Sequence, residues 1–303
     1  MRHAWRLSLG AILIQVVNLG CGDCGFGVAD CPSPTPPPTT LPPVTAPPAL
    51  PSPQTPPIRT TIVQRTSAIA SHPIVSVDLP GGYKVIGGGA NVNYGGPGNL
   101  LTASFPETPT RWTAEAKDHS VSDPASITVY AIGLEDPLDQ WDVRLVSATG
   151  GTASFPSASV TVPAGYTMTG GGARDNWSGA GNLLTSSFPS STTSWEGRGK
   201  DHSVVSPASI TVYAIGIRPR NGSPLPQLQI FGGSAPLAEH PSGFASIVPG
   251  FTLSGGGAIV NFSGAGNLLT GSYPVSSTQW SALSKSHSVS SPATVSIFAL
   301  GIR

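Results

Sequence analysis

Cysteine is missing from most of this chain, because all three cysteines lie between Cys21 and Cys31. Beyond them, disulfides cannot stabilise the fold and thiol catalysis is excluded. Charge is also scarce: 10% of the residues are charged and the formal net charge is zero. Such a balance gives no electrostatic footprint for nucleic acid, so no nucleic-acid partner is expected. No helical period of apolar residues is evident after residue 20.

The chain is instead rich in glycine and in one long repeat. It contains 37 glycines, and the segment 162–217 has counterparts at 79–134 and 248–302. Corresponding residues are offset by 83 and then 85 positions. The landmarks are glycine triplets beginning at Gly87, Gly170 and Gly255, tryptophans Trp112, Trp195 and Trp280, and histidines His119, His202 and His287. Three equivalent structural units must therefore be strung or stacked together.

Each unit alternates apolar and polar residues in short runs bounded by turn residues, which predicts five or six strands. The expected fold is all-β, with three tandem homologous antiparallel modules, sandwich-like or prism-like, at 58–134, 141–217 and 226–303. The sequence does not decide between one fused body and separate modules. It favours modules packed against one another with approximate threefold symmetry. A glycine triplet in mid-strand requires a bulge or a close backbone approach. The small residues after each tryptophan favour packing over an open platform.

The first 20 residues resemble an export signal. Arg2 and Arg6 precede an apolar run that is too short to span a bilayer comfortably. The run ends at Leu19-Gly20-Cys21, which resembles the lipobox of bacterial lipoproteins, whose cysteine is acylated. Cys24 and Cys31 would then remain as an even pair able to form a disulfide. An ordinary cleaved signal peptide is the alternative.

A proline-rich spacer follows, and we expect 21–57 to be a disordered stalk. Thirteen of the 26 residues in 32–57 are proline, a composition that favours extended polyproline II. A lipid anchor followed by a stalk holds a protein away from a membrane. The expected location is the outer membrane or cell surface as a lipoprotein, otherwise secreted, with membrane contact through the lipid alone.

The motifs of each unit resemble those of an exported bacterial β module with the pattern CPxG…GGGA…SxP…W…AYAIC. In unit 2 the matching stretches are Val162-Pro163-Ala164-Gly165, Gly170-Gly171-Gly172-Ala173, Ser187-Phe188-Pro189, Trp195 and Val212-Tyr213-Ala214-Ile215-Gly216. Val162 and Gly216 stand where the pattern has cysteines, so any disulfide of that module is lost here. The resemblance implies an exported β domain and no established activity.

A polar set with a neighbouring aromatic recurs in every unit and is the candidate ligand site. Its members in units 1, 2 and 3 are Asn93, Tyr94, Lys117 and His119; Asn176, Trp177, Lys200 and His202; and Asn261, Phe262, Lys285 and His287. Amide, ammonium and imidazole groups beside an aromatic ring suit a hydroxyl-rich ligand such as a glycan or polysaccharide. Alternatively, the asparagines fix turns while the histidines and lysines satisfy buried carbonyls.

A metal site formed by the three histidines would require them to converge on one axis, and no metal is predicted. His72 and His240 form a further equivalent pair, but unit 2 has Phe155 at that position. An aromatic ring in place of an imidazole favours packing there rather than ligation.

Catalysis and cofactors are not expected. An acidic residue closely follows the tryptophan in units 1 and 2, as Glu115 and Glu196, but unit 3 has Leu283 at the position of Glu115, so no carboxylate pair recurs. The glycine triplets precede no helix, which a nucleotide-binding loop would require. The expected function is therefore non-catalytic binding of glycan or envelope polysaccharide. A structural or adhesive repeat protein without a small-ligand site is the alternative.

Overall fold

The computed structural model describes residues 52–303. The predicted signal, the lipidation site Cys21, the pair Cys24 and Cys31, and the stalk up to residue 51 lie outside these residues. Within the described range every regular element is a β-strand, which confirms the all-β prediction. The last residues of the predicted stalk contact the body, because Gln54 and Thr55 hydrogen-bond to Asn221 and Pro224 in the linker before unit 3.

Each unit has six strands. Unit 1 contains β1 (Thr60–Thr66), β2 (Ile74–Asp78), β3 (Tyr83–Asn93), β4 (Leu100–Thr108), β5 (Arg111–Lys117) and β6 (Ser126–Glu135). Unit 2 contains β7 (Trp141–Thr149), β8 (Ser157–Thr161), β9 (Thr167–Asn176), β10 (Leu183–Pro189), β11 (Ser194–Lys200) and β12 (Ser209–Pro219). Unit 3 contains β13 (Leu228–Ala238), β14 (Ser242–Ser246), β15 (Thr252–Asn261), β16 (Asn267–Pro274), β17 (Gln279–Ser286) and β18 (Ala293–Ile302).

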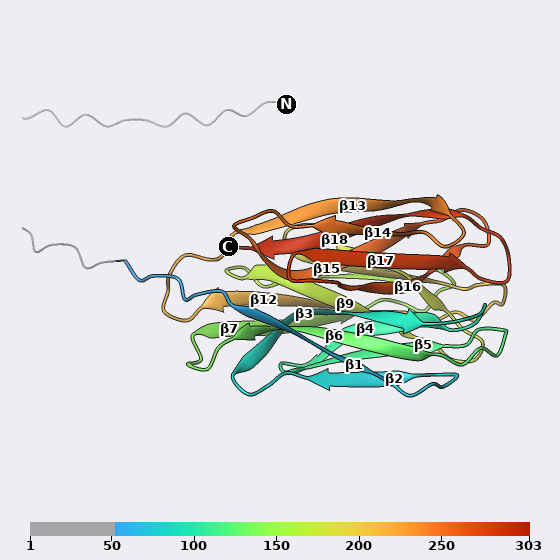
Figure 1. The fold of residues 1–303 in the computed structure, drawn as a ribbon, viewed down its shortest axis with the longest axis horizontal. Helices are drawn as coiled ribbons and strands as arrows, with labels where there is room; N and C mark the ends of the chain where they lie inside the picture. Colours follow the sequence, from blue (N-terminus) through green and yellow to red (C-terminus); the bar gives the residue numbers. More distant parts are fainter. Residues whose placement is uncertain (1–51) are drawn as a thin grey trace, which may run out of the picture. The chain divides into compact units, whose positions relative to one another are not determined.

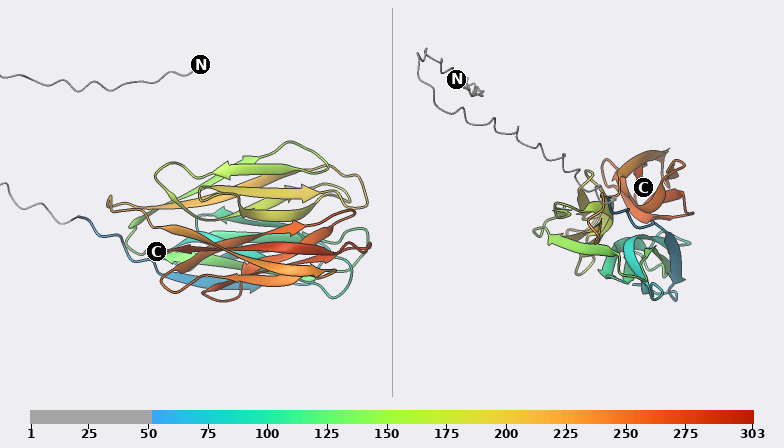
Figure 2. Two further views of the ribbon diagram at one scale, coloured as in Figure 1. Left: turned by 90° about the horizontal axis from the view of Figure 1, so that it is seen from above. Right: turned by 90° about the vertical axis from the view of Figure 1, so that its left-hand side faces the viewer.

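The units share their sheets. The described strands form three antiparallel six-stranded sheets, in the orders β1-β6-β3-β16-β17-β14, β13-β18-β15-β10-β11-β8 and β2-β5-β4-β9-β12-β7. Every sheet thus takes three strands from one unit and three from another. Viewed end-on, the units surround a common axis as three lobes (Figure 2). The repeats therefore form one closed body.

The two ends of this body differ. Residues 52–59 and the C-terminus lie at one end (Figure 1). The loops after β3 and β5, and their counterparts in the other units, lie at the opposite end, because β3 and β6 pair Tyr83 with Glu135 and Asn93 with Ser126. We call this second end the loop end. It carries the predicted polar set.

The glycine triplets allow the backbones of the three units to pack closely around the common axis. A Cβ atom built on Gly170 would lie 2.7 Å from the carbonyl oxygen of Ile86 and 3.1 Å from the Cα of Gly87. Gly255 approaches unit 2, and Gly87 approaches unit 3, in the same way. The register shifts beside each triplet. Both devices anticipated from the sequence, a bulge and a close backbone approach, are therefore present.

Short stretches of pairing and stacked rings join the units on the outside. At each seam only two residue pairs join the strands of the two units within their shared sheet, for example Ala103 with Arg174 and Ser104 with Ala173. One aromatic pair bridges each seam: Phe105–Tyr213, Tyr130–Tyr273 and Phe188–Phe298, with centroids 5.1, 5.0 and 6.0 Å apart. Such pairs each contribute about 0.5–1.5 kcal/mol beyond their buried area.

We predict that Gly170→Ala lowers the free energy of unfolding by about 1–3 kcal/mol, because the new methyl group would press on the backbone of unit 1. Urea unfolding followed by tryptophan fluorescence measures the change. Gly232→Ala is the control, since a Cβ there meets no atom within 4 Å, and it should stay within about 0.5 kcal/mol of the parent. Equal stability of the two variants would show that the glycine triplet is not required for closure.

Candidate functional site

The three histidines of the predicted set form a closed ring about the axis at the loop end. Nε2 of His119 lies 2.7 Å from the carbonyl oxygen of His202. Nε2 of His202 lies 2.7 Å from that of His287, and Nε2 of His287 lies 2.7 Å from that of His119. The ring centroids are 5.2–5.4 Å apart, and none of the three residues is more than 1% exposed. Each unit therefore contacts the next through its histidine.

The second nitrogen of each ring also faces a carbonyl. Nδ1 of His119 lies 2.8 Å from the Ala180 oxygen, and Nδ1 of His202 lies 3.0 Å from the Ala265 oxygen. A carbonyl oxygen only accepts, whereas a neutral imidazole donates from one nitrogen. Two hydrogen bonds per ring would therefore require protonation. Burial opposes this, because it lowers the pKa of His119 and His202. These side chains have no free donor for an external ligand.

The lysines of the set are buried at the seams, each against the loop aromatic of another unit. The cation-to-centroid distances are 4.0 Å for Lys117–Trp177, 4.8 Å for Lys200–Phe262 and 3.7 Å for Lys285–Tyr94. Lys117 also donates to the carbonyl of Ala180, at 2.9 Å. Burial lowers the pKa of Lys117 and of Lys285 to about 8, and lowers that of Lys200. Cation–π contact and carbonyl acceptors partly offset the cost of removing these ammonium groups from water.

The asparagines of the set lie apart from the histidines and lysines. The exposed Asn176 donates to the hydroxyl groups of Ser209 and Thr211 on its own sheet. Asn93 and Asn261 make the equivalent bonds in the other units. The structure thus brings together Lys, His and aromatic residues from different units, but leaves the asparagines outside this cluster. For the histidines and lysines this arrangement matches the alternative interpretation, in which they satisfy backbone carbonyls. These three asparagines, however, bond to side-chain hydroxyls and do not fix turns as that interpretation expected.

The histidines converge on the axis without pointing at a common ion, since every Nε2 contacts a carbonyl. Within residues 52–303, no group of three or more His, Cys, Asp or Glu side chains could hold a metal ion. The carboxylates considered for catalysis are paired with arginines: Glu115 with Arg174 at 3.1 Å and Glu196 with Arg198 at 2.6 Å.

A strained turn follows each histidine and was not anticipated from the sequence. Ser120, Ser203 and Ser288 have φ values of 58°, 60° and 60°. The amide of Val121 donates to the His119 carbonyl at 2.7 Å, which closes a three-residue γ-turn. Turns of this type with a positive φ are rare, and here the turn aims the histidine carbonyl at the neighbouring imidazole. The His-Ser-Val sequence that recurs in every unit is the feature from which this turn could have been predicted.

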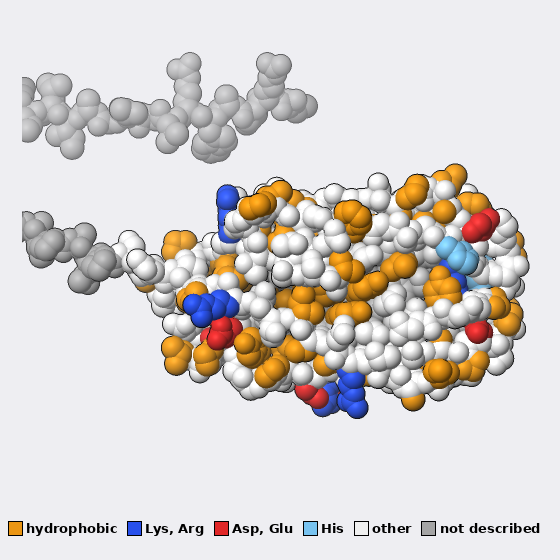
Figure 3. Space-filling model, viewed as in Figure 1, with side chains coloured by type: hydrophobic (Ala, Val, Ile, Leu, Met, Phe, Trp, Pro, Cys, Tyr) orange, Lys and Arg blue, Asp and Glu red, His pale blue; other side chains and the backbone are white. Residues whose placement is uncertain are grey.

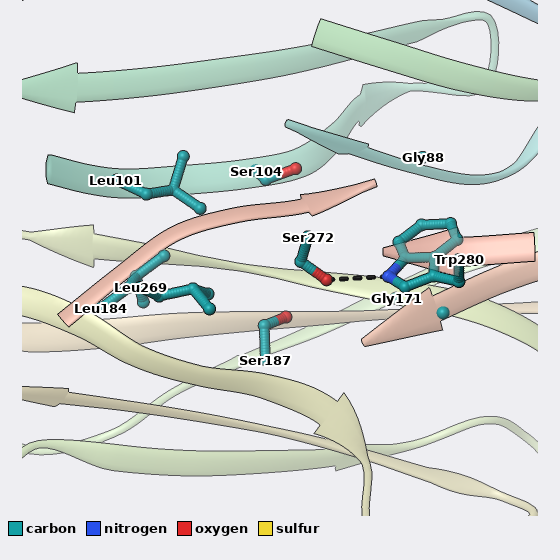
Figure 4. A pocket seen from close by; sticks show the side chains of 10 residues that line it. Gly88, Leu101, Ser104, Gly171, Leu184, Ser187, Leu269, Ser272 and Trp280 are labelled. Atoms are coloured by element: carbon teal, nitrogen blue, oxygen red, sulfur yellow. Dashed lines mark hydrogen bonds between the residues drawn. The ribbon is translucent and has the colours of Figure 1, made fainter. Parts of the chain in front are cut away.

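The tryptophans of the repeats are buried, as the small residues beside them suggested, and each ring covers the middle glycine of its own unit's triplet. Trp280 donates to Ser272 at 2.9 Å and its ring covers Gly256. A cavity of about 20 Å³ lies there, lined by equivalent glycines, leucines and serines of all three units (Figure 4). It has room for about one water molecule, so this cavity is too small for a sugar.

A buried carboxyl group occurs in unit 2 alone. Asp175 is 1% exposed and stands where the other units have the core residues Val92 and Val260. Among the described residues neither of its oxygens has a hydrogen-bond partner. Burial raises the pKa of Asp175 to about 7, against the attraction of Lys117. Aligning the three repeats could have revealed this residue, as a charge at a core position.

Phe155 is not packed as the sequence suggested. It is 65% exposed, whereas its counterparts do contact rings of other units: His72 lies 5.4 Å from Trp177 and His240 lies 6.4 Å from Tyr94, between centroids. The prediction of packing at Phe155 was therefore wrong. The reason is that its position faces a hollow rather than a partner ring.

Charged side chains are few on the surface. One face shows mostly uncharged and apolar atoms, with histidine reaching the surface near the loop end (Figure 3). No helix in residues 52–303 has the length and apolar character needed to cross a membrane.

No protein-family model matches the chain, and no curated protein matches it significantly. The resemblance to the exported bacterial β module stays a prediction from motifs.

We predict that His202→Ala lowers the free energy of unfolding by about 1–3 kcal/mol, because the carbonyls of His287 and Ala265 lose their contacts inside the body. Thermal unfolding followed by circular dichroism gives the value. Asn176→Ala, an exposed member of the same set, is the control and should change it by no more than about 0.5 kcal/mol. If the histidine variant were as stable as the control, the histidine ring would have no structural role.

We predict that Asp175→Val is more stable than the parent, increasingly so as the pH rises from about 4 to 7. The pKa of this carboxyl is near its ordinary value of 3.8 in the unfolded chain, and burial raises it to about 7 in the folded protein. Between these values the unfolded state therefore loses its proton first. Ionisation therefore costs the parent up to about 4 kcal/mol by pH 7. Urea unfolding at several pH values measures the difference.

Asp175→Asn is the matched control for this titration. It removes the ionisation but keeps a buried polar group, so it should lose the pH dependence while gaining less stability than the valine variant. Parallel pH profiles for parent and valine variant would contradict the assignment.

Proposed function

We propose that this chain is an exported, non-catalytic display protein whose three fused β units form a rigid binding head for glycan or envelope polysaccharide. The observation that carries the proposal is the closed histidine ring, which joins the three units into one body. A body closed in this way needs no ligand to assemble. The fold therefore acts as a scaffold, and any ligand must bind without the buried histidines and lysines of the shared set.

The order of segments supports display. Residues 1–20 resemble an export signal, Cys21 is the expected lipidation site, and the proline-rich spacer would hold the head away from the membrane. The described body receives the chain at one end and has its loops at the other (Figure 1).

A purely structural or adhesive repeat protein is the second candidate. The lysines and histidines of the shared set favour this candidate, because all six are buried in contacts between units and none is available to a ligand. The two candidates differ in whether the surface contains a hollow suited to a small ligand.

The anchor is tested by labelling cells that produce the chain with an alkyne analogue of palmitate. We predict that the parent incorporates the label and sediments with membranes, and that Cys21→Ser does neither, because the acylated cysteine is the only expected membrane contact. Cys24→Ser is the control and should remain labelled. Digestion of intact cells with an added protease should remove the head from the parent. An unlabelled parent, or a head protected from the protease, would contradict surface display.

A further inference from the structure

The seam between units 2 and 3 has a hollow of about 250 Å³ on the outside of the body. Phe155 and Phe262 line it, together with the hydroxyl-bearing residues Thr185 and Ser186 and the guanidinium-bearing Arg198. Phe155 comes from the loop before β8, and Phe262 directly follows β15. An exposed phenyl ring at the mouth of a hollow with polar walls is typical of a ligand site rather than of a packing defect.

The corresponding positions at the other two seams are filled differently. His72 packs against Trp177 at one seam and His240 against Tyr94 at the other, so a ring of one unit covers the loop aromatic of the next. At the seam between units 2 and 3, Phe155 stands in the place of the histidine, so Phe262 has no histidine ring packed against it. Phe155 itself is 65% exposed. The hollow between units 2 and 3 therefore depends on a residue that the other units do not share.

The ring of Phe262 is held in place from within the body. The ammonium group of Lys200 lies 4.8 Å from the ring centroid of Phe262 and donates to the carbonyl of Ala265 in the following loop. Lys200 is only 3% exposed. A ring fixed in this way loses little conformational entropy when a ligand stacks on it.

The lining indicates the chemistry of the ligand. Two phenyl rings offer apolar surface for the C–H face of a sugar ring. Thr185 and Ser186 are 2% and 1% exposed, and the Thr185 hydroxyl already donates to the carbonyl of Arg198, so Thr185 can offer a sugar hydroxyl only an acceptor. Arg198 supplies further donors, but its guanidinium is paired with Glu196 at 2.6 Å. Because this pair is neutral overall and the Lys200 ammonium is only 3% exposed, the hollow offers no unpaired, exposed cation to an anionic ligand. The volume suits one or two sugar rings.

We propose that this hollow binds a neutral saccharide of one or two rings, stacked between Phe155 and Phe262. The proposal deepens the proposed function and rests on it. It replaces the triplicated site expected from the sequence with a single site at one seam. Of the predicted ligand-binding residues it keeps Phe262 at the surface and assigns Lys200 a supporting position.

The test is saturation-transfer NMR on the full chain with glucose, galactose, mannose, N-acetylglucosamine and their β-linked disaccharides as probes. We expect transfer to at least one neutral sugar, reduced at least fivefold in Phe155→Ala. Phe155→His places the residue of units 1 and 3 in this position, so it preserves the fold and should reduce transfer similarly. His72→Ala alters the equivalent position at another seam and should leave transfer unchanged.

Three results would overturn the proposal: no transfer to any neutral sugar, transfer that survives both Phe155 variants, or stronger transfer to the matching uronic acids than to the neutral sugars. Equal losses in Phe155→Ala and His72→Ala would place binding elsewhere and also overturn it. The palmitate and protease experiments are independent of this outcome, so a failed saccharide site and a failed surface location are distinguishable.

Discussion

The structure depends on how closely three backbones can approach one another at the axis. Gly170 touches the backbone of unit 1, Gly255 that of unit 2, and Gly87 that of unit 3. Any side chain at these positions would separate the units. The sheets could then no longer continue across the seams, where only two residue pairs join them. The cohesion of the whole body thus follows from the absence of side-chain atoms at three points.

Polar contacts give this assembly its specificity. Apolar surfaces alone would tolerate sliding between units, because the hydrophobic effect is non-directional. The histidine ring and the buried lysines require particular carbonyls at particular distances, and an unpaired ammonium group in these seams would be costly. Three γ-turns present the carbonyls in the required direction. The polar residues therefore define the register in which the units meet, while the glycines and tryptophans allow them to come close.

Much of the single unit could be predicted from the sequence, because strand periodicity and the glycine triplet act locally. The partner of each side chain could not, since Lys117 finds its aromatic ring in the next unit and not beside its own loop. A repeat shows which residues correspond but not which units they join. For the same reason the polar set resembled three separate sites. Phe155 was misjudged because its surroundings belong to two units, and Asp175 was passed over although its counterparts are valines.

The covalent fusion of the three units has a consequence for what their seams can become. In a trimer of identical chains, every substitution appears three times and every seam is the same. Here one seam has two phenylalanines around a hollow, another has a buried carboxyl group beside a lysine, and the third has neither. In a single chain, each seam can therefore change independently of the other two, while all three units remain packed in one body of approximate threefold symmetry.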